Sequence, residues 1–212
     1  DYASSRKNPI PVFAEMGSVN PVFLFKEELS SDPNKYAVML ADSITLGVGQ
    51  FCTNPGIIVG LDSPALLQFT EQLADRISAS VTGKMLHMGI AQAYEQKAKR
   101  AITQKGVKIN SDADKHPTKE NSSAMVVSVT ASNFLANPIL REEVFGPFSL
   151  VVICNDYSEM KRVAEVMNGQ LTSTLIATQQ DVKTHQDIVD IVTSKCGRII
   201  INGVPTGVEV CL

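Results

Sequence analysis

The sequence predicts an α/β fold in which two layers of helices enclose a mostly parallel β-sheet, an α/β/α arrangement. Apolar, strand-like runs alternate with amphipathic helical patterns along most of the 212 residues, an order that is typical of βαβ units. The segment 148–154, Phe-Ser-Leu-Val-Val-Ile-Cys, is apolar on both faces, as expected for a strand in the middle of a covered parallel sheet.

The first half of the chain begins with an apolar, extended segment at 9–14 and a glycine-containing turn at 15–21, followed by a strand at 22–25. Asp32 and Pro33 have the residue types of an N-cap and a first helical position, so a helix is expected to start there. Apolar residues follow at helical spacing and support this helix: Tyr36, Met39, Leu40 and Ile44.

The rest of the chain continues the alternation, with helix starts marked by Ser63-Pro64 and a helix end marked by Gly106. Residues 110–123, rich in Asp, Lys, Asn and Ser, are expected to form a surface loop, and the end of the chain, 202–212, is loop-like. The expected strands are 57–59, 124–129, 148–154, 171–177 and 198–201, and the expected helices are 64 to just before Gly83, 90–105, 158–168 and 181–193.

The composition is that of an ordinary folded protein, with 44% hydrophobic and 19% charged residues. The formal net charge of −3 leaves no excess of basic residues that would attract nucleic acid. No apolar run approaches the length of a bilayer crossing, and residues 1–7 have no apolar segment behind them of the kind found in a secretion signal. We therefore expect a cytoplasmic protein with neither nucleic acid nor membrane as a partner.

The most informative stretch is 47–56, Gly-Val-Gly-Gln-Phe-Cys-Thr-Asn-Pro-Gly. Three glycines and a proline interrupt the helical pattern and an apolar run follows, so Cys52 should lie on a tight connection between a helix and a strand. A thiolate there could attack a carbonyl, and backbone N–H groups of the turn could bind the oxyanion. The alternative is that Cys52 is a small buried residue filling a tight corner.

The other cysteines suggest no further chemistry. Cys154, Cys196 and Cys211 are far from Cys52 and from one another, with no C-x-x-C pair and no histidine at the spacing of a zinc site. Neither a disulfide framework nor a metal site is expected, and Cys154, inside the apolar strand 148–154, should be part of the core.

Four segments carry a pattern when they are taken in order. They are 15–21 (Glu-Met-Gly-Ser-Val-Asn-Pro), 49–53 (Gly-Gln-Phe-Cys-Thr), 141–147 (Arg-Glu-Glu-Val-Phe-Gly-Pro) and 202–210 (Asn-Gly-Val-Pro-Thr-Gly-Val-Glu-Val). They resemble the glutamate motif E-L-G-G-K-x-P, the nucleophile motif G-Q-x-C, the E-E-[IV]-F-G-P motif and the late substrate-side loop of the aldehyde dehydrogenase superfamily. The Ser-Val pair in the first segment, where most members have Gly-Lys, narrows the resemblance to the α-ketoglutaric semialdehyde dehydrogenase branch.

This resemblance implies oxidation of a small aldehyde to the acid with NAD or NADP, with a short dicarboxylic semialdehyde such as 2,5-dioxopentanoate as substrate. It implies that Cys52 is the nucleophile, through a thiohemiacetal and a thioester, and that Glu15 activates water for hydrolysis. Glu143 would bind the nicotinamide-ribose hydroxyls and Phe145 would pack near the nicotinamide. The residues alone leave simpler alternatives open: Glu15 as a turn residue, Glu143 as an exposed carboxylate and Phe145 as core.

The resemblance also implies a domain organisation. Residues 1–212 would be the nucleophile-bearing catalytic domain of a larger, homo-oligomeric enzyme, because the family's dinucleotide-binding domain and C-terminal oligomerisation segment have no counterpart here. Two alternatives stay open for the isolated chain. It could be a folded but inactive module, or a cysteine esterase or acyl-transfer enzyme that needs no cofactor.

Overall fold

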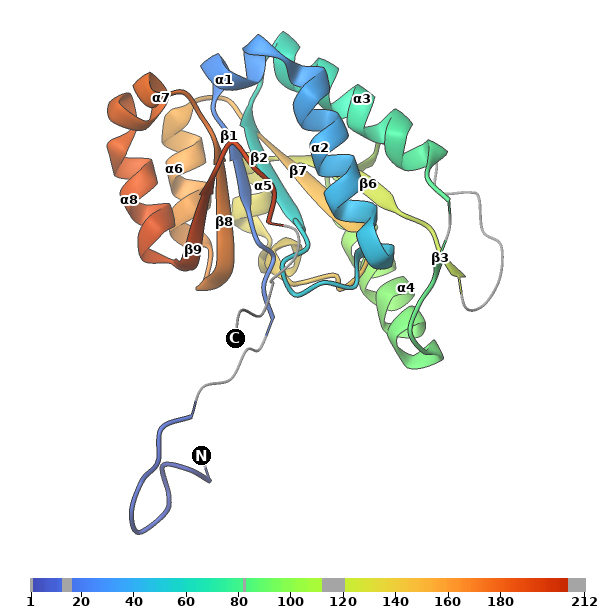
Figure 1. Cartoon of the computed structure of the whole chain (residues 1–212), viewed down its shortest axis with the longest axis vertical. Helices are drawn as coiled ribbons and strands as arrows, with labels where there is room; N and C mark the ends of the chain where they lie inside the picture. The colour runs from blue at the N-terminus through green and yellow to red at the C-terminus, as the bar shows by residue number, and fades with distance from the viewer. Residues whose placement is uncertain (1, 13–16, 82, 112–120, 206–212) are drawn as a thin grey trace, which may run out of the picture.

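A computed structural model describes residues 2–12, 17–81, 83–111 and 121–205. The centre of the described fold is a seven-stranded sheet with the strand order β4-β6-β7-β2-β1-β8-β9 (Figure 1). All neighbouring pairs are parallel except β4 and β6, and β3 pairs separately with β5. The strands are β1 (Val22–Leu24), β2 (Ile57–Leu61), β3 (Gly83–Lys84), β4 (Lys108–Ile109), β5 (Asn121–Ser122), β6 (Met125–Thr130), β7 (Phe148–Cys154), β8 (Gln170–Ile176) and β9 (Cys196–Ile201).

Helices cover both faces of this sheet (Figure 1). One face carries α1 (Lys26–Ser31), α2 (Pro33–Thr45) and α3 (Pro64–Ala79). None of the helices in the described ranges is both long and apolar enough to cross a membrane. The other face is covered by α4 (Met88–Ile102), α5 (Ala131–Ala136), α6 (Tyr157–Val166), α7 (Gln179–Thr184) and α8 (Gln186–Ser194), while η1 (Leu46–Gly49) and η2 (Pro138–Arg141) are short 3₁₀ turns.

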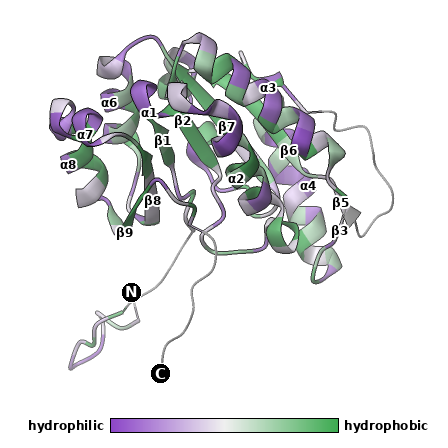
Figure 2. Ribbon diagram, turned by 45° about the horizontal axis from the view of Figure 1, so that its top comes forward, coloured by the Kyte–Doolittle hydropathy of each residue, from purple (hydrophilic) through white to green (hydrophobic). Residues whose placement is uncertain are grey.

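The two layers of core follow from the alternation of side chains along each strand. In β1, Val22 and Leu24 pack with α1, α2 and α3, whereas Phe23 packs in the opposite layer. In β7, Val151 and Val152 point to opposite layers, and both are fully buried. Figure 2 shows the resulting hydrophobic strands between helices whose surfaces are mixed. The predicted three-layer α/β class, and the prediction that β7 is a covered central strand, are confirmed.

Most of the predicted elements are present, with differences that have local causes. The predicted helix at 181–193 is two helices, α7 and α8, because the backbone leaves helical geometry at His185 (φ −116°, ψ 39°). Helix α4 begins at Met88, not at 90, because the His87 side chain accepts hydrogen bonds from the first backbone N–H groups. Helices α1 and α5 were not predicted. Of the predicted extended segment, 9–12 is exposed without regular structure and the remainder lies outside the described residues, as does most of the predicted loop at 110–123.

Helix α7 begins with a capping box. Thr178 Oγ1 accepts from the Asp181 N–H at 3.0 Å, and Asp181 Oδ2 accepts from the Thr178 N–H at 2.9 Å. Thr178→Ala is expected to lower the free energy of unfolding by about 1 kcal/mol, because the first turn of α7 loses an acceptor. Urea denaturation checks this. Ser30→Ala, which removes an exposed hydroxyl inside α1, is the control, and an equal loss in both variants would contradict the capping role.

The arrangement of the parallel strands determines where distant segments meet. The segments leading into β1, β2 and β7, together with the first residue of β8, lie at the same edge of the sheet, because the amino ends of parallel strands lie together (Figure 1). Three of the four motifs found in the sequence immediately precede β1, β2 and β7. The candidate site is therefore at the amino edge of the sheet.

Candidate active site

Cys52 lies on the connection between η1 and β2, as predicted. The N–H of Asn54 donates to the carbonyl of Phe51 at 3.1 Å and closes a tight turn, residues 51–54. The Cys52 side chain is exposed, so the alternative that it fills a buried corner is wrong. Gln50, just before this turn, connects it to the segment of Leu86, because Gln50 Oε1 accepts from the Leu86 N–H at 2.9 Å.

The backbone N–H of Cys52 is available for a ligand. Within the described residues, neither this N–H nor the Cys52 thiol has a hydrogen-bond partner. The carbonyl of the same peptide unit belongs to Phe51 and accepts from Asn54, and in a planar trans peptide the N–H points the opposite way. The turn thus offers a thiol and a free donor on one residue, which is the arrangement that a tetrahedral oxyanion needs.

Asn20 joins this turn to the rest of the site. Its side chain is 1% exposed, and its Nδ2 donates to the carbonyls of Cys52 at 2.8 Å and Asn54 at 3.1 Å. Its Oδ1 accepts from Ser18 Oγ at 2.9 Å and from Thr172 Oγ1 at 3.0 Å. One side chain therefore connects the segment before β1, the 51–54 turn and strand β8.

Gln170, the first residue of β8, holds the backbone that carries Asn20. Its Oε1 accepts from the N–H of Val19 at 2.7 Å, from the N–H of Asn20 at 3.2 Å and from Ser18 Oγ at 3.1 Å. Sequence reasoning identified neither Asn20 nor Gln170 as a site residue. Asn20 lies inside the first motif, 15–21, whereas Gln170 is 150 residues away from Asn20 and no local sequence pattern marks it.

Glu143 lies against the glycine of the first motif. Its carboxylate is so close to Gly17 that a Cβ at this glycine would be 2.9 Å from Glu143 Oε2. Gly17 also has a φ of 127°, which favours glycine. Glu143 is half-buried, whereas its neighbour Glu142 is exposed and pairs with Arg100 at 2.7 Å. The two adjacent carboxylates therefore have different environments, and Glu143 is the one that lies against Gly17.

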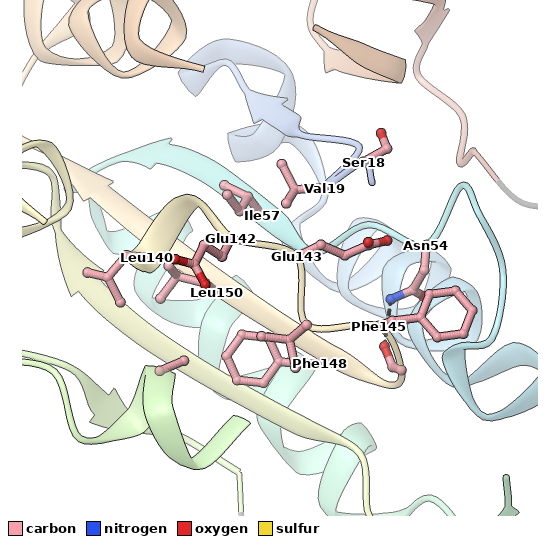
Figure 3. A pocket seen from close by; sticks show the side chains of 14 residues that line it. Ser18, Val19, Asn54, Ile57, Leu140, Glu142, Glu143, Phe145, Phe148 and Leu150 are labelled. Atoms are coloured by element: carbon pink, nitrogen blue, oxygen red, sulfur yellow. Dashed lines mark hydrogen bonds between the residues drawn. The ribbon is translucent and has the colours of Figure 1, made fainter. Parts of the chain in front are cut away.

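The loop before β7 is joined directly to the 51–54 turn. Asn54 Nδ2 donates to the carbonyl of Gly146 at 2.9 Å, which Figure 3 shows as a dashed line. Phe145 is half-buried, so it is not the core residue of the simpler alternative. The structure brings Cys52, Glu143 and Phe145 to one region. Glu15 and residues 206–210 of the last motif lie outside the described residues.

Glu143 lines two cavities. The first offers about 20 Å³, room for one water molecule, between Ser18, Asn54, Glu143 and Phe145 (Figure 3). Asn54 Oδ1 is buried and has no hydrogen-bond partner within the described ranges, so this cavity has an acceptor for such a water. The second is an open cleft of about 400 Å³ that runs past Gly17, Glu143 and Gln170. It is large enough to admit part of an extended ligand.

Cys154 differs from Cys52 in its exposure. It is fully buried on β7, as predicted, and burial raises the pKa of its thiol to about 12, with Glu159 and Asp156 adding to the effect. In the described part of the chain Cys52, Cys154 and Cys196 are free thiols, and no group of three His, Cys, Asp or Glu residues could hold a metal ion.

Alkylation with iodoacetamide should therefore separate the cysteines. At pH 8 we expect Cys52 to react at least about tenfold faster than Cys154, because a thiol with a pKa near 12 is almost entirely protonated there. Peptide mass spectrometry gives the rate for each cysteine, and Cys52→Ala identifies the Cys52 signal. Equal labelling of Cys52 and Cys154 in the native protein would contradict the exposure and burial described above.

The site consists of an exposed cysteine on a turn at the amino edge of a mostly parallel sheet, and Asn54 joins that turn to the loop that carries Glu143. This is an α/β domain with a residue of nucleophilic type on an exposed turn. The sequence model of the aldehyde dehydrogenase family matches residues 2–211, and the chain therefore belongs to this family. The family resemblance seen in the motifs is confirmed.

Two relatives are similar along nearly the whole chain. Alpha-ketoglutaric semialdehyde dehydrogenase 2 of Azospirillum brasilense is 41% identical over 209 residues, which are 99% of this chain and 40% of that protein. Alpha-ketoglutaric semialdehyde dehydrogenase of Acinetobacter baylyi is 37% identical over 211 residues, again 99% and 40%. The chain thus spans about 40% of the length of these relatives.

The fold matches a solved structure of the family. Glyceraldehyde-3-phosphate dehydrogenase from Methanocaldococcus jannaschii, determined in complex with NADP, superimposes with a TM-score of 0.73 at 20% identity, covering 92% of this chain and 41% of that one. At this identity the likeness shows the fold alone.

Proposed function

We propose that this chain is the nucleophile-bearing domain of an NAD(P)-dependent aldehyde dehydrogenase that oxidises α-ketoglutaric semialdehyde (2,5-dioxopentanoate). The observation that carries the proposal is the junction of the Cys52 turn with the loops of Gly17 and Glu143 at one edge of the sheet. The names of the two relatives support the substrate. Because those relatives are longer, we also propose that a dinucleotide-binding part and an oligomerisation segment belong to the whole protein.

The proposed chemistry uses groups of this chain. The Cys52 thiolate attacks the aldehyde carbon, a C–S bond forms, and the carbonyl electron pair moves to oxygen, where the Cys52 N–H donates to the oxyanion. NAD or NADP, when bound, would supply the acceptor for the hydride that this carbon loses. Water then attacks the resulting thioester, the C–S bond breaks and the acid leaves. Glu15, in the glutamate motif, is proposed to take the proton from that water.

The residues near Glu143 fit the cofactor that the family implies. The half-buried Glu143 carboxylate presents two acceptor oxygens beside the 400 Å³ cleft, and vicinal ribose hydroxyls are donors suited to such a group. Gly17 leaves space directly at this carboxylate, where any side chain would collide with Glu143. We propose that Glu143 binds the ribose hydroxyls and that Phe145, on the same loop, packs near the nicotinamide.

A chimera tests the proposal. Residues 2–211 replace the matching 40% of the Azospirillum brasilense relative, and oxidation of α-ketoglutaric semialdehyde is followed with NAD and with NADP. We expect cofactor-dependent turnover, with benzaldehyde as a poorer substrate than the semialdehyde. A folded chimera that oxidises neither aldehyde would contradict the proposal, and would favour a folded but inactive domain.

A cofactor-independent esterase is the second candidate, favoured by one observation: the thiol and the free N–H are both on Cys52. In this case the isolated chain would hydrolyse p-nitrophenyl acetate with repeated turnover and without NAD or NADP. A dehydrogenase domain would form the same acyl-Cys52 thioester and, through Glu15, could hydrolyse it, so the NAD(P)-dependent aldehyde oxidation of the chimera is the measurement that separates the two candidates. Full esterase activity in Cys52→Ser would exclude Cys52 from the hydrolysis.

A further inference from the structure

Both peptide units that flank Cys52 are held by hydrogen bonds. The Phe51–Cys52 unit is held through the Phe51 carbonyl, which accepts from the N–H of Asn54. The Cys52–Thr53 unit is held through the Cys52 carbonyl, which accepts from Asn20 Nδ2 at 2.8 Å. Asn20 is thus the side chain that determines the orientation of the second peptide unit, and its bond to the Asn54 carbonyl supports the closing residue of the turn.

Asn20 is itself in a demanding conformation. Its φ is 43°, in the left-handed region. Glycine has the lowest conformational cost there, and asparagine is tolerated better than most other residues. A residue selected only for this backbone shape would be glycine. The asparagine amide adds two donors for the carbonyls of Cys52 and Asn54, together with an acceptor for Ser18 and Thr172.

We propose that Asn20 is a positioning residue for the nucleophile. Its amide holds the 51–54 turn in the conformation in which the Cys52 N–H is free of internal partners and available to the oxyanion. The inference rests on the proposed role of Cys52. Without Asn20, the thiol would still be exposed, but the Cys52 carbonyl would lose its buried donor and the turn could rotate its peptides. Reactions that develop an oxyanion should then suffer more than reactions that do not.

Two reagents distinguish these cases in the same protein. With p-nitrophenyl acetate, the Cys52 sulfur attacks the ester carbonyl, a negative oxygen develops, the C–O bond breaks and p-nitrophenolate leaves. With iodoacetamide, the sulfur displaces iodide from a saturated carbon and no oxyanion forms. The ratio of the Cys52 acylation rate to its alkylation rate therefore reports the oxyanion donor and not thiol exposure or ionisation.

Asn20→Gly keeps the backbone conformation and removes the amide, whereas Asn20→Asp keeps the shape and the acceptor but removes both donors. We expect acylation of Cys52 to fall at least about tenfold in each variant, with alkylation changed less than about threefold. Thr172→Val removes only one donor to Asn20 Oδ1 and should lower the acylation-to-alkylation ratio by about twofold to threefold. This milder variant keeps the test usable if the Asn20 variants do not fold.

Thr178→Ala is the matched control, because it weakens the cap of α7 at the opposite edge of the sheet and should leave the ratio unchanged. Wild-type ratios in folded Asn20→Gly and Asn20→Asp, or in Thr172→Val if those two do not fold, would overturn the inference and leave the proposed function standing. Equal losses in acylation and alkylation would reduce Asn20 to a structural role and overturn it as well. Failure of the wild-type chain to be acylated faster at Cys52 than at Cys196 would instead overturn the proposed role of Cys52.

Discussion

Cys52→Ser is expected to lower aldehyde oxidation by the chimera at least about a thousandfold, as is typical when an enzyme loses its nucleophile. The serine hydroxyl matches the thiol in shape but is almost entirely protonated at neutral pH, and this turn offers no adjacent base within the described residues to activate it. The measurement is the rate of NADH or NADPH formation at saturating substrate.

Cys196→Ser is the control for this substitution. Cys196 is a half-buried free thiol at the start of β9, and its replacement should leave oxidation within about twofold of the parent chimera. Comparable activity in Cys52→Ser and Cys196→Ser would rule out a covalent role for Cys52 and, with it, the mechanism proposed for this domain.

Gly49→Ala is expected to lower the free energy of unfolding by about 3 to 4 kcal/mol, through overpacking and backbone strain together. Gly49 has a φ of 64°, and a Cβ there would meet the Gly146 carbonyl carbon and the Pro147 nitrogen at 2.3 Å. The nearest atoms are all backbone atoms of the Gly146–Pro147 peptide, so the clash cannot be relieved by a side-chain rotation. Urea denaturation measures the loss.

The matched control is Gly56→Ala at the other end of the same connection. Gly56 is outside the left-handed region, and its added Cβ would have the Val19 carbonyl oxygen as nearest atom, at 3.4 Å. The cost there should stay below about 1 kcal/mol. If both substitutions cost the same, the close approach of the 47–56 segment to the loop before β7 would not be a determinant of stability.

The elements that the sequence predicts well are those with strong local signals. Helix α2 follows the Asp32-Pro33 start, and the predicted bounds of β7 are those observed, because a run apolar on both faces has few alternatives. Helices α1 and α5 have only six residues each, too few for a helical period to stand out. At the break between α7 and α8 the His185 ring stacks on Tyr157, a contact between distant residues that no local pattern reveals.

The candidate site also has one part that local sequence signals predict and another part that they do not. Glycine and proline around Cys52 predict an exposed turn, and the structure confirms it. The contact from Asn20 to Cys52 spans 32 residues and pairs a side chain with a backbone carbonyl, so neither periodicity nor residue type indicates it. The contact between Gln170 and Asn20 spans 150 residues, and no local sequence pattern indicates it either. The roles of Glu15, Glu143 and Phe145 stay predictions that rest on the motifs.

The amino-edge site also has a consequence for the order of folding. Its residues lie at or just before the amino ends of β1, β2, β7 and β8. Loops of up to 150 residues must therefore close before Asn20, Cys52 and Gln170 can come into contact. Contacts so distant in sequence form slowly and depend on the central sheet being paired. A refolding chain is therefore expected to bury its core before it completes the 51–54 turn, and the acylation-to-alkylation ratio of Cys52 should reach its native value last.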